Sequence, residues 1–479
     1  MTLLRIVLRF VVLRRVMVTQ NWSRDRATSP VFTDFIVKIF LIWTEEGRGS
    51  GVVIEEEEDY SLKSRLLTYN INISTSVMNR LRPIMNVVDK ELSAVVVMNL
   101  IACVKRQEKL LYSRDKGNHS TKKTKYNRRG VQSHRLIKCL DTLEALGYIH
   151  NFVGKGHIDK EKRIMSYITP SEAFIAEFCS TDEEVQSAIA AYNASLQTII
   201  LRNEYGKAID YQDNKNIKNA RKIVEKLNKI NELHDIRDGS GNVMTNIYSR
   251  IFNKDFEHGG RYFHSDALKI KHKKSKARLD ITINGEQVVE IDFSNLHYRI
   301  ASLMEQISME NLPLDVYMDI LPERLQNDEH RELIKLSINI LFNSKTTDSA
   351  DRAINAEIRK FTIQGWNFDK SLSTGKKVRE YIYSMTPDFL SCYCRDDSFG
   401  LALQNADSYL AQRVIEKFVD EMKPILPIHD SFVVRMSDLG FLENAMGDSF
   451  REEFGIASLI PLKMSWKDGN VLQESKILA

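Results

Sequence analysis

The sequence predicts an α+β protein of two or three domains, and three segments of the chain support this prediction. Val288–Ile291 is a strand-like apolar run that ends at Asp292 and leads into a helical pattern. Leu401–Met422 is a long amphipathic helical pattern, and strand-like residues on both sides of Asp430 follow it. Ser133–Leu146 is a shorter amphipathic helix with two strand-like runs after it. The whole chain has 479 residues, too many for one compact core.

The amino-acid composition is that of an ordinary folded protein, with 43% apolar and 28% charged residues. The net charge of +4 is small, but the basic residues cluster. Between Val104 and Lys138 there are twelve Lys and Arg residues against two acids, Glu108 and Asp115. A second basic cluster consists of Lys269, Lys271, Lys273, Lys274, Lys276 and Arg278. A single basic run is usually a solvated face, but two such runs beside functional motifs favour a nucleic-acid partner.

Cysteine usage and hydropathy lead us to expect a cytoplasmic protein. The five cysteines are scattered without zinc-site spacing, which indicates a reduced protein without structural disulfides. No apolar run is long enough to span a bilayer, so no membrane partner is expected. Leu3–Val18 is apolar but interrupted by arginines, and is either a membrane-surface helix or a poorly ordered leader. Residues 1–69 are taken as leader and linker, and the sequence indicates no obligate protein partner.

Residues 70–178 combine a strongly patterned helix with two short strands. In Ser133–Leu146, leucines recur at every third or fourth position along one face. Tyr148–Val153 and Ile164–Ile168 read as strands, joined by the basic hairpin Gly154–Arg163. The order of helix, strand, basic hairpin and strand resembles a winged helix-turn-helix domain.

This resemblance implies that the helix enters a DNA major groove and that the hairpin rests on phosphates. Many winged helices bind proteins instead, and the charge bias favours nucleic acid here. The candidate contacts are Lys122, Lys123, Lys125, Arg128 and Arg129. Residues 179–254 are predicted to be a helical connector or thumb-like region, because Ser180–Asn242 has helical patterns with long polar faces.

Two acidic residues stand beside strand-like runs in the C-terminal half. Asp292 ends the strand Val288–Ile291 and begins the sequence DFSNLHYR. A carboxylate at the end of a buried strand is costly unless it is paired or binds a metal, although such an aspartate can also simply cap the following helix. Asp430 lies in Pro427–Arg435, which reads PIHDSFVVR, where apolar residues flank a His-Asp pair as in a hairpin turn.

Between these two segments lies a helical pattern with cations on one face. The segment His330–Lys345 reads HRELIKLSINILFNSK. Arg331 and Lys335 are four residues apart and therefore project from the same face. Phe342 follows two turns later on nearly the same face. A surface helix with two solvated cations would also explain this pattern on its own.

In this order along the chain, the three segments resemble motifs A, B and C of the family A DNA polymerases and the single-subunit RNA polymerases of phages and mitochondria. DFSNLHYR is similar to the DYSQIELR of motif A. The His-Asp-Ser of the last segment is similar to motif C, which reads HDE in the DNA polymerases and HDS in the RNA polymerases. The preceding helix carries Gln404, as the Gln-bearing helix before motif C does. The middle segment departs from motif B, because Asn343 and Ser344 stand where the family has a Tyr-Gly pair.

The resemblance covers about Asp255–Trp466 and implies a polymerase right hand, with palm and fingers in residues 255–479. It implies a DNA polymerase that binds a DNA template, a primer and dNTPs and uses two Mg²⁺ ions, or Mn²⁺ in their place. The metal ligands would be Asp292, the Phe293 carbonyl and Asp430. Lys335 would be the general acid for the pyrophosphate. The nucleotide-binding residues would be Arg331, Lys335, Phe342, His297 and Asn295. The primer and template contacts would be His429, Gln404, Arg261 and Arg278.

The sequence leaves open whether the sugar of the nucleotide substrate is deoxyribose or ribose. His297 stands where the DNA polymerases carry a Glu that helps to exclude a ribose 2′-hydroxyl, and a His could block the ribose or donate a hydrogen bond and admit it. The HDS triplet and His258–Phe263, which resembles a template-contacting loop, favour an RNA polymerase. The compact DFSNLHYR favours DNA synthesis, which we prefer.

Two alternatives accompany this reading of the sequence. One is an RNA polymerase or a primase-like enzyme that accepts rNTPs. The other is a non-catalytic winged-helix protein that initiates or regulates replication, although decay of a polymerase should have altered Asp292, Lys335 or Asp430. No proofreading domain is evident. A small polymerase with its own DNA-binding module would suit a phage, a plasmid or another mobile element.

Overall fold

The computed structural model describes residues 64–81, 89–116, 119, 122–154, 165–270, 276–309, 312–396, 398–469 and 471–479. The mixed α+β composition that the sequence predicts is confirmed for these residues. Most of the predicted leader and linker lies outside the described residues, as do nearly all of the hairpin Gly154–Arg163 and the lysines Lys271, Lys273 and Lys274. In the described part of the chain, no helix combines the length and the apolar character that a membrane span requires.

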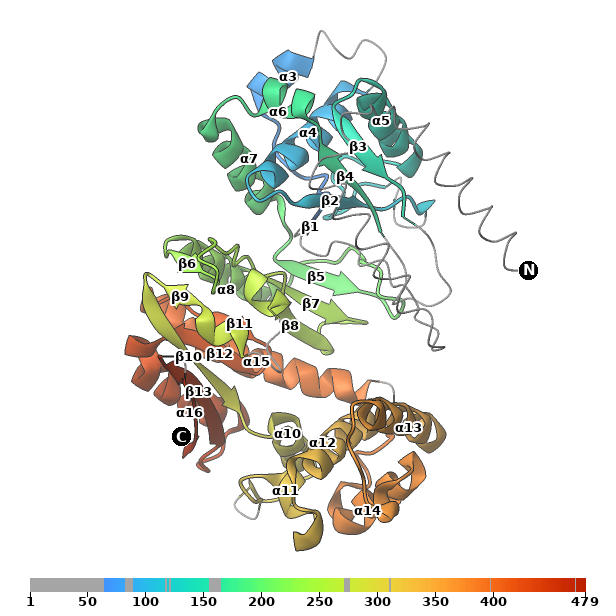
Figure 1. Cartoon of the computed structure of the whole chain (residues 1–479), viewed down its shortest axis with the longest axis vertical. Coiled ribbons are helices and arrows are strands. Elements are labelled where there is room, and N and C mark those ends of the chain that lie inside the picture. Colours follow the sequence, from blue (N-terminus) through green and yellow to red (C-terminus); the bar gives the residue numbers. More distant parts are fainter. Residues whose placement is uncertain are drawn as a thin grey trace, which may run out of the picture. The chain divides into compact units, whose positions relative to one another are not determined.

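The N-terminal part of the described chain is a four-stranded sheet with helices packed around it (Figure 1). The strands follow the order β1 (Ser64–Leu66), β2 (Lys109–Tyr112), β4 (Ser166–Pro170) and β3 (Ile149–Phe152). The helices are α3 (Thr75–Leu81), α4 (Lys90–Val104), α5 (Ser133–Ala145), α6 (Glu172–Phe178) and α7 (Asp182–Ser195). Helix α4 is the centre of this part, because nearly all of its residues are buried.

The predicted helix and strand pair of this part are present, but the predicted domain boundary at residue 178 is too early. Helix α5 begins at Ser133, and β3 pairs antiparallel with β4 so that Phe152 lies opposite Tyr167. Val185, Ala188 and Tyr192 of α7 pack into the same apolar core. The N-terminal core therefore continues through α7, whose exposed polar face made it look like part of a connector.

The predicted helical connector at residues 179–254 is only partly helical. It contains α8 (Lys215–Glu232), but also the short strands β5 (Ile199–Arg202), β6 (Ile236–Arg237) and β7 (Ser249–Asn253). Strands β5 and β7 form a sheet with β8 (Gly259–Phe263) in the order β5-β7-β8. The buried face of α8 belongs to the same core as the C-terminal half. The C-terminal part therefore begins near Ile199, about fifty residues earlier than the sequence indicated.

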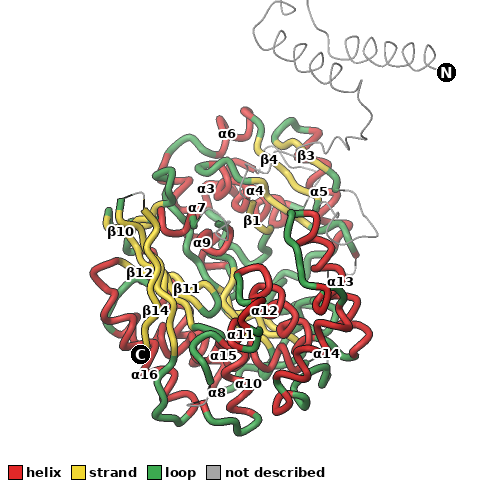
Figure 2. Tube along the Cα trace, turned by 60° about the horizontal axis from the view of Figure 1, so that its bottom comes forward, coloured by secondary structure: helices red, strands yellow, loops and turns green. Residues whose placement is uncertain are grey.

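The sheet that carries both aspartates has the strand order β11-β12-β10-β13-β14 (Figure 2). Its strands are β10 (Glu286–Phe293), β11 (Leu426–Ile428), β12 (Ser431–Arg435), β13 (Pro461–Asp468) and β14 (Val471–Leu478), and β9 (Thr282–Ile283) joins β6 to β10. Helix α16 (Leu439–Phe454) packs against β10 and β12, and α15 (Phe399–Asp420) packs against α16 and β8. Both faces of β10 are buried, because Val289, Ile291 and Phe293 pack into one apolar core and Val288 packs into another.

Helices fill the chain between β10 and α15. They are α10 (Leu296–Met304), α11 (Val316–Asp319), α12 (Asp328–Asn343), α13 (Thr347–Ile363) and α14 (Gly375–Met385). The side chain of Asn327 caps α12 by accepting a hydrogen bond from the His330 N–H at 3.0 Å. Helix α12 packs against α13, α14 and α15 (Figure 1). This packing determines which face of α12 can line the cavity described below.

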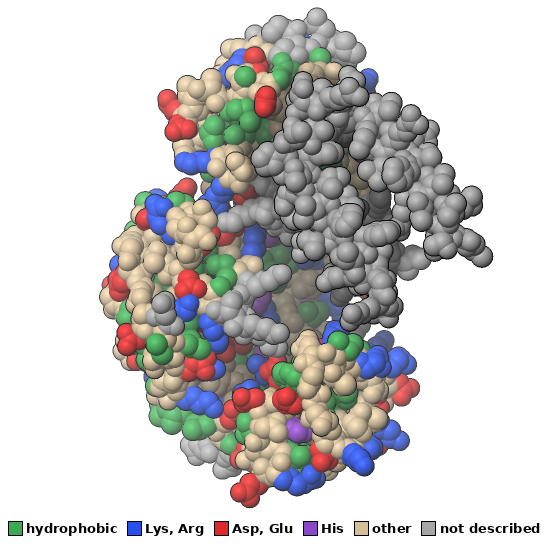
Figure 3. Space-filling view, in the orientation of Figure 1, with side chains coloured by type: hydrophobic (Ala, Val, Ile, Leu, Met, Phe, Trp, Pro, Cys, Tyr) green, Lys and Arg blue, Asp and Glu red, His purple; other side chains and the backbone are tan. Residues whose placement is uncertain are grey.

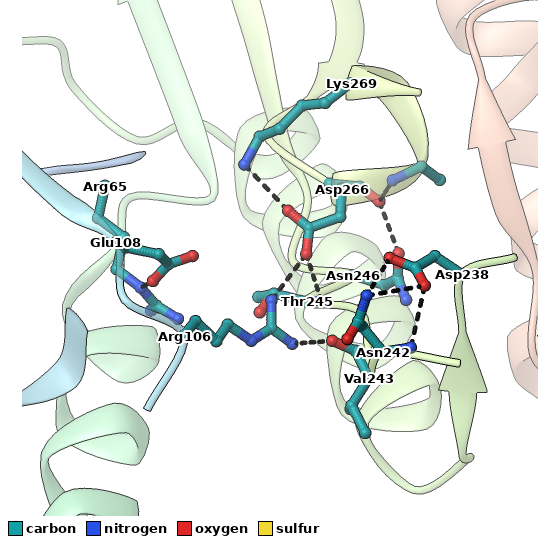
Figure 4. Close-up of polar contacts among 12 residues, drawn as sticks. Arg65, Arg106, Glu108, Asp238, Asn242, Val243, Thr245, Asn246, Asp266 and Lys269 are labelled. Carbon is teal, nitrogen blue, oxygen red and sulfur yellow. Dashed lines mark hydrogen bonds and ion pairs between the residues drawn. The ribbon is translucent and has the colours of Figure 1, made fainter. Parts of the chain in front are cut away.

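Arg106 connects the N-terminal sheet to the C-terminal part (Figure 4). Its guanidinium donates to the Asp266 carboxylate at 2.7 Å and to the Val243 carbonyl at 2.6 Å. Asp266 is the first residue of α9 (Asp266–Lys269), and it also accepts hydrogen bonds from the Thr245 N–H at 2.7 Å and from Lys269 Nζ at 3.0 Å. Burial opposes its ionisation, but Lys269, the Thr245 N–H and Arg106 together lower the pKa of Asp266.

Candidate active site

Asp292 of β10 and Asp430 of the turn before β12 lie next to each other. Asp292 is near the end of β10, directly opposite Ser431 of β12. Asp430 lies in the turn that joins β11 to β12, and its carbonyl accepts a hydrogen bond from the Phe293 N–H at 3.2 Å. The turn is tight, because His429 adopts a left-handed backbone with φ 60°. The structure therefore brings together the two aspartates that the sequence selected.

A cavity of about 660 Å³ opens over this pair of aspartates. This volume lies in the usual range for small-molecule sites in proteins. The residues selected from the sequence that line it are Arg261, Asp292, Phe293, Asn295, His297, Arg331, Lys335, Gln404 and Asp430. Among the lining residues that the sequence did not single out are Asp315, Tyr317, Asn339, Lys463 and Lys476. The cavity wall is therefore strongly charged, with cations and carboxylates interspersed.

A divalent cation would lower the electrostatic cost of ionising Asp292. Burial and the neighbouring Asp430 raise the pKa of Asp292 well above its ordinary value, while Lys335 and Lys463 act in the opposite direction. Burial and the charge of Asp430 both disfavour the ionised form of Asp292, and a bound cation would favour it. Hard oxygen ligands of this kind are those that Mg²⁺ and Mn²⁺ prefer.

Phe293 contributes its main chain to the cavity wall. Its ring is buried in the core, with centroids 6.4 Å from Phe432 and 6.3 Å from Phe450. Among the described residues, no three acidic, His or Cys side chains converge to hold a metal. The carboxylates that line the cavity at this place are those of Asp292 and Asp430. Mg²⁺ commonly keeps waters and takes one or two carboxylates together with substrate phosphate oxygens, so this set fits it.

One face of α12 forms the wall opposite the aspartates. Arg331, Lys335, Asn339 and Asn343 follow one another at intervals of four residues, and all four line the cavity. Lys335 lies close enough to Asp292 to lower the pKa of that carboxyl. The predicted pair of cations on this helix therefore faces the same cavity as the predicted pair of aspartates.

The predicted role of Phe342 as a nucleotide-stacking aromatic is wrong. Its side chain is 0% exposed and packs against Tyr393 and Phe399, with ring centroids 5.5 Å and 5.7 Å away. Phe342 does lie near the Lys335 face of α12, but Tyr393 and Phe399 cover its ring. The aromatic residue that lines the cavity is instead Tyr317 of α11.

Arg331 is held by an acidic residue that the sequence did not reveal. Asp315 caps α11 and accepts two hydrogen bonds from Arg331 Nε, at 3.0 Å and 2.8 Å. Lys476 of β14 reaches the same carboxylate at 3.2 Å. Burial opposes ionisation of Asp315, but Arg331 and Lys476 lower its pKa. A phosphate that binds Arg331 must therefore compete with Asp315.

A second hidden carboxylate, Asp407 of α15, holds two of the predicted site residues. It accepts a hydrogen bond from His297 Nε2 at 2.7 Å and from Arg261 Nε at 3.0 Å. The side chain of Asp407 is fully buried. Arg261 comes from β8, whose Gly260 has φ 93° and no room for a side chain beside Phe252 and Ser408. The glycines of the predicted HGGRYF loop thus allow β8 to approach α15.

Two of the predicted primer and template contacts, Arg278 and His429, are not among the residues that line the cavity. Arg278 donates to the carboxylate of Glu290, a buried residue of β10, with Nε 3.2 Å from Oε2. This ion pair supports the sheet behind Asp292, so the Arg278 guanidinium is already engaged. His429 is half-buried beside the Phe263 ring, at 5.5 Å between centroids, and among the described residues its Nδ1 has no hydrogen-bond partner.

The basic segment before α5 is partly structural. Lys125 forms an ion pair with Asp213 at 3.1 Å, and Asp213 also binds Arg221 of α8. Arg129 donates to Glu91 at 2.8 Å. Lys122, Lys123 and Arg128 are exposed. The predicted nucleic-acid contacts Lys125 and Arg129 are therefore ion-paired within the protein.

Basic and acidic side chains are interspersed on the visible face of the molecule (Figure 3). A nucleic-acid interface would thus depend on particular side chains rather than on one uniformly basic surface on this face. Comparison of the sequence with protein-family models finds no matching family. Comparison with curated proteins finds no match either.

Proposed function

We propose that the protein is a template-directed nucleotidyltransferase, and specifically a DNA polymerase of the family A type. One observation carries the proposal. Asp292 of β10 lies beside Asp430 of the adjoining β11–β12 turn, and the cations Arg331 and Lys335 of α12 line the same cavity. Phosphoryl transfer requires mainly positioning and neutralisation of charge, and this cavity supplies both kinds of group.

In this proposal each group of cavity residues has its own chemical role. Two Mg²⁺ ions, when bound by Asp292, Asp430 and the Phe293 main chain, would neutralise negative charge on the reacting phosphate and polarise the attacking hydroxyl. Lys335 and Arg331 bind the triphosphate, and Arg331 exchanges Asp315 for phosphate oxygens when it does so. Lys335 donates a proton to the leaving pyrophosphate.

A primer-extension assay tests the proposal. Wild-type protein with Mg²⁺, a labelled primer-template and dNTPs should extend the primer, and Asp292→Asn and Asp430→Asn should each lower the rate by at least about a thousandfold, as loss of a central charge-stabilising group does. Asp438→Asn is the matched control. Asp438 is also a buried, ion-paired aspartate, bound to Lys423 and Arg435, and lies outside the cavity.

The outcomes separate the alternatives. Extension with dNTPs alone supports a DNA polymerase, extension with rNTPs alone supports an RNA polymerase, and synthesis without a primer supports a primase-like enzyme. Equal incorporation by the wild type and Asp430→Asn would overturn the catalytic proposal. Absence of extension together with tight DNA binding would favour the non-catalytic initiator or regulator.

We also propose that the N-terminal part, with α5 and the β3–β4 pair, binds DNA. The exposed side chains Lys122, Lys123 and Arg128 support this proposal. Neutralising all three should reduce the slope of log affinity against log salt by roughly three, because each phosphate contact contributes about 0.9. Lys125→Ala is the control, because its ammonium is paired with Asp213 and its loss should change the slope less. An unchanged slope in the triple variant would indicate a protein-binding module.

A further inference from the structure

A row of four apolar side chains crosses the outer face of the N-terminal sheet. Each member is paired directly with the next in the strand registers, and directly opposed residues project from the same face of a sheet. The adjacent residues Leu110 and Ile168 point the other way, into the N-terminal core. The row therefore lies on the face that turns away from this core. From β1 to β3 it consists of Leu66, Leu111, Tyr167 and Phe152.

The two aromatic members of the row form a stack that ends at the edge of the sheet. The rings of Phe152 and Tyr167 are nearly parallel, with an interplanar angle of 16° and centroids 4.6 Å apart. The Lys109 ammonium lies 4.6 Å from the centroid of the Tyr167 ring, in an attractive cation–π contact. Phe152 belongs to the edge strand β3, and 46% of it is exposed. The stack therefore presents the Phe152 ring to solvent.

No acidic side chain projects from this face of the four described strands. Besides the row, the outward positions are Ser64, Lys109, His150 and Thr169. Exposed apolar patches mark interaction sites, and the charge around this one favours an anionic partner. Single-stranded nucleic acid meets both conditions, because its unpaired bases offer flat π faces and its phosphates carry negative charge.

We propose that the outer face of the N-terminal sheet is a stacking platform for unpaired bases of single-stranded DNA. The inference rests on the proposed DNA binding by the N-terminal part and is independent of the proposed catalysis. A base stacks on the exposed ring of Phe152 and extends the stack of Tyr167 and Lys109, while the Lys109 ammonium attracts the phosphates. Binding of this kind tolerates any base sequence, because every base has a π face.

Fluorescence anisotropy of a labelled oligodeoxythymidine of about ten nucleotides, a usual site size for such platforms, tests the inference on the full chain. Phe152→Leu keeps an apolar side chain but removes the ring, and should weaken binding by about five- to a hundredfold, the loss expected for one stacked base. Phe152→Trp keeps a ring and should retain the wild-type affinity. Tyr205→Leu is the matched control, because Tyr205 is an 84% exposed aromatic residue that follows β5, outside this sheet.

Two further measurements locate the bound strand. The bases inside a blunt-ended duplex are already stacked and paired, so Phe152→Leu should leave the affinity for such a duplex unchanged. An oligonucleotide that carries 5-iodouracil forms photochemical cross-links to aromatic side chains on which the base stacks. In the wild type, mass spectrometry should map the cross-link to the peptide that contains Phe152, and the Phe152→Leu protein should lose it.

The failures of the two proposals differ. A Phe152→Leu protein that binds the single strand as the wild type does overturns the inference, leaves the proposed DNA binding standing and assigns the apolar row to a protein partner. Equal losses for single strand and duplex, or cross-links that map only to the cavity over Asp292, also overturn it. Tighter binding of an RNA strand of matching length overturns the assignment to DNA. A wild type that binds neither form of DNA overturns the proposed DNA binding and the inference with it.

Discussion

Asp292 of β10 and Lys463 of β13 form a cross-strand pair, directly opposite each other in the antiparallel register. Lys463 lowers the pKa of Asp292, against the effects of burial and of Asp430. Its ammonium also pairs with Glu474 of β14 at 3.0 Å. The floor of the cavity is therefore not purely acidic, because a lysine of the C-terminal hairpin stands beside the carboxylate pair.

Replacement of Lys463 by Ala should weaken Mg²⁺-nucleotide binding by about threefold, since a half-exposed charge contributes below about 1 kcal/mol. The loss should shrink at high salt, where the interaction is screened. Lys463→Arg, which keeps the charge, is the control. Titration of dATP at low and high salt measures the effect, and a loss that persists undiminished at high salt would contradict the electrostatic explanation.

Truncation of Phe342 should affect stability rather than substrate binding. Phe342→Ala should lower the free energy of unfolding by about 3–5 kcal/mol, because it leaves a cavity among Tyr393 and Phe399. Phe342→Leu should cost less and leave dATP affinity unchanged. Urea unfolding and nucleotide titration measure the two effects. A Phe342→Leu protein of normal stability that binds dATP much more weakly would restore the stacking role.

The crossing of α12 and α15 leaves no room for a side chain at Gly400. A Cβ there would lie 1.9 Å from Asn343 Oδ1. Gly400→Ala should therefore destabilise the protein by about 1–3 kcal/mol, and adding Asn343→Ala should recover most of the loss. Gly440→Ala on α16 is the matched control: a Cβ there meets nothing within 4 Å, and the change should be neutral or stabilising. Thermal unfolding of the three variants and the wild type measures the effect, and equal behaviour of Gly400→Ala and Gly440→Ala would refute the explanation.

The link between Arg106 and Asp266 should make stability depend on pH. The pKa of Asp266 is lower in the folded protein than in the unfolded chain, so the folded state is favoured when this carboxyl is ionised. Its contribution is fully present above the ordinary pKa of an aspartate, about 4, and is lost as the pH falls through the lower folded value.

Arg106→Ala removes part of this stabilisation. At neutral pH it should cost about 1–3 kcal/mol, the usual loss when a hydrogen bond to a charged group is broken, and the difference from the wild type should narrow below about pH 4. Denaturation curves at several pH values measure it. A difference that grows as the pH falls would show that some other group carries the effect.

The elements that could be predicted from the sequence are those whose signal is local. Asp292 stands out because an acid ends an apolar strand, and Arg331 and Lys335 because four residues make one turn of a helix. Asp407 could not be found in this way. It lies inside a long amphipathic helix, and its partner His297 is 110 positions away. Nothing in the nearby sequence distinguishes it from a solvent-facing acid.

Phe342 shows a second limit of sequence patterns. Helical periodicity correctly put it near the face of Lys335, but periodicity says nothing about what covers each end of that face. Tyr393 and Phe399 cover the end at Phe342. The strands β5 and β6 were missed for a similar reason: they are 4 and 2 residues long, and pairing with distant strands determines them rather than their own sequence.

The pairing of β10 with β12 also has a consequence for how the chain acquires its activity. Ser431 and Glu290, which meet across these two strands, are separated by 141 positions, and all of α10 to α15 lies in the loop between them. Closing so long a loop is slow, because its entropy is lost before the contacts form. We therefore expect Asp292 and Asp430 to come together late in folding. A chain in which β10 and β12 have not paired would lack the adjoining carboxylates of Asp292 and Asp430, so in the proposed function nucleotide incorporation would require this pairing.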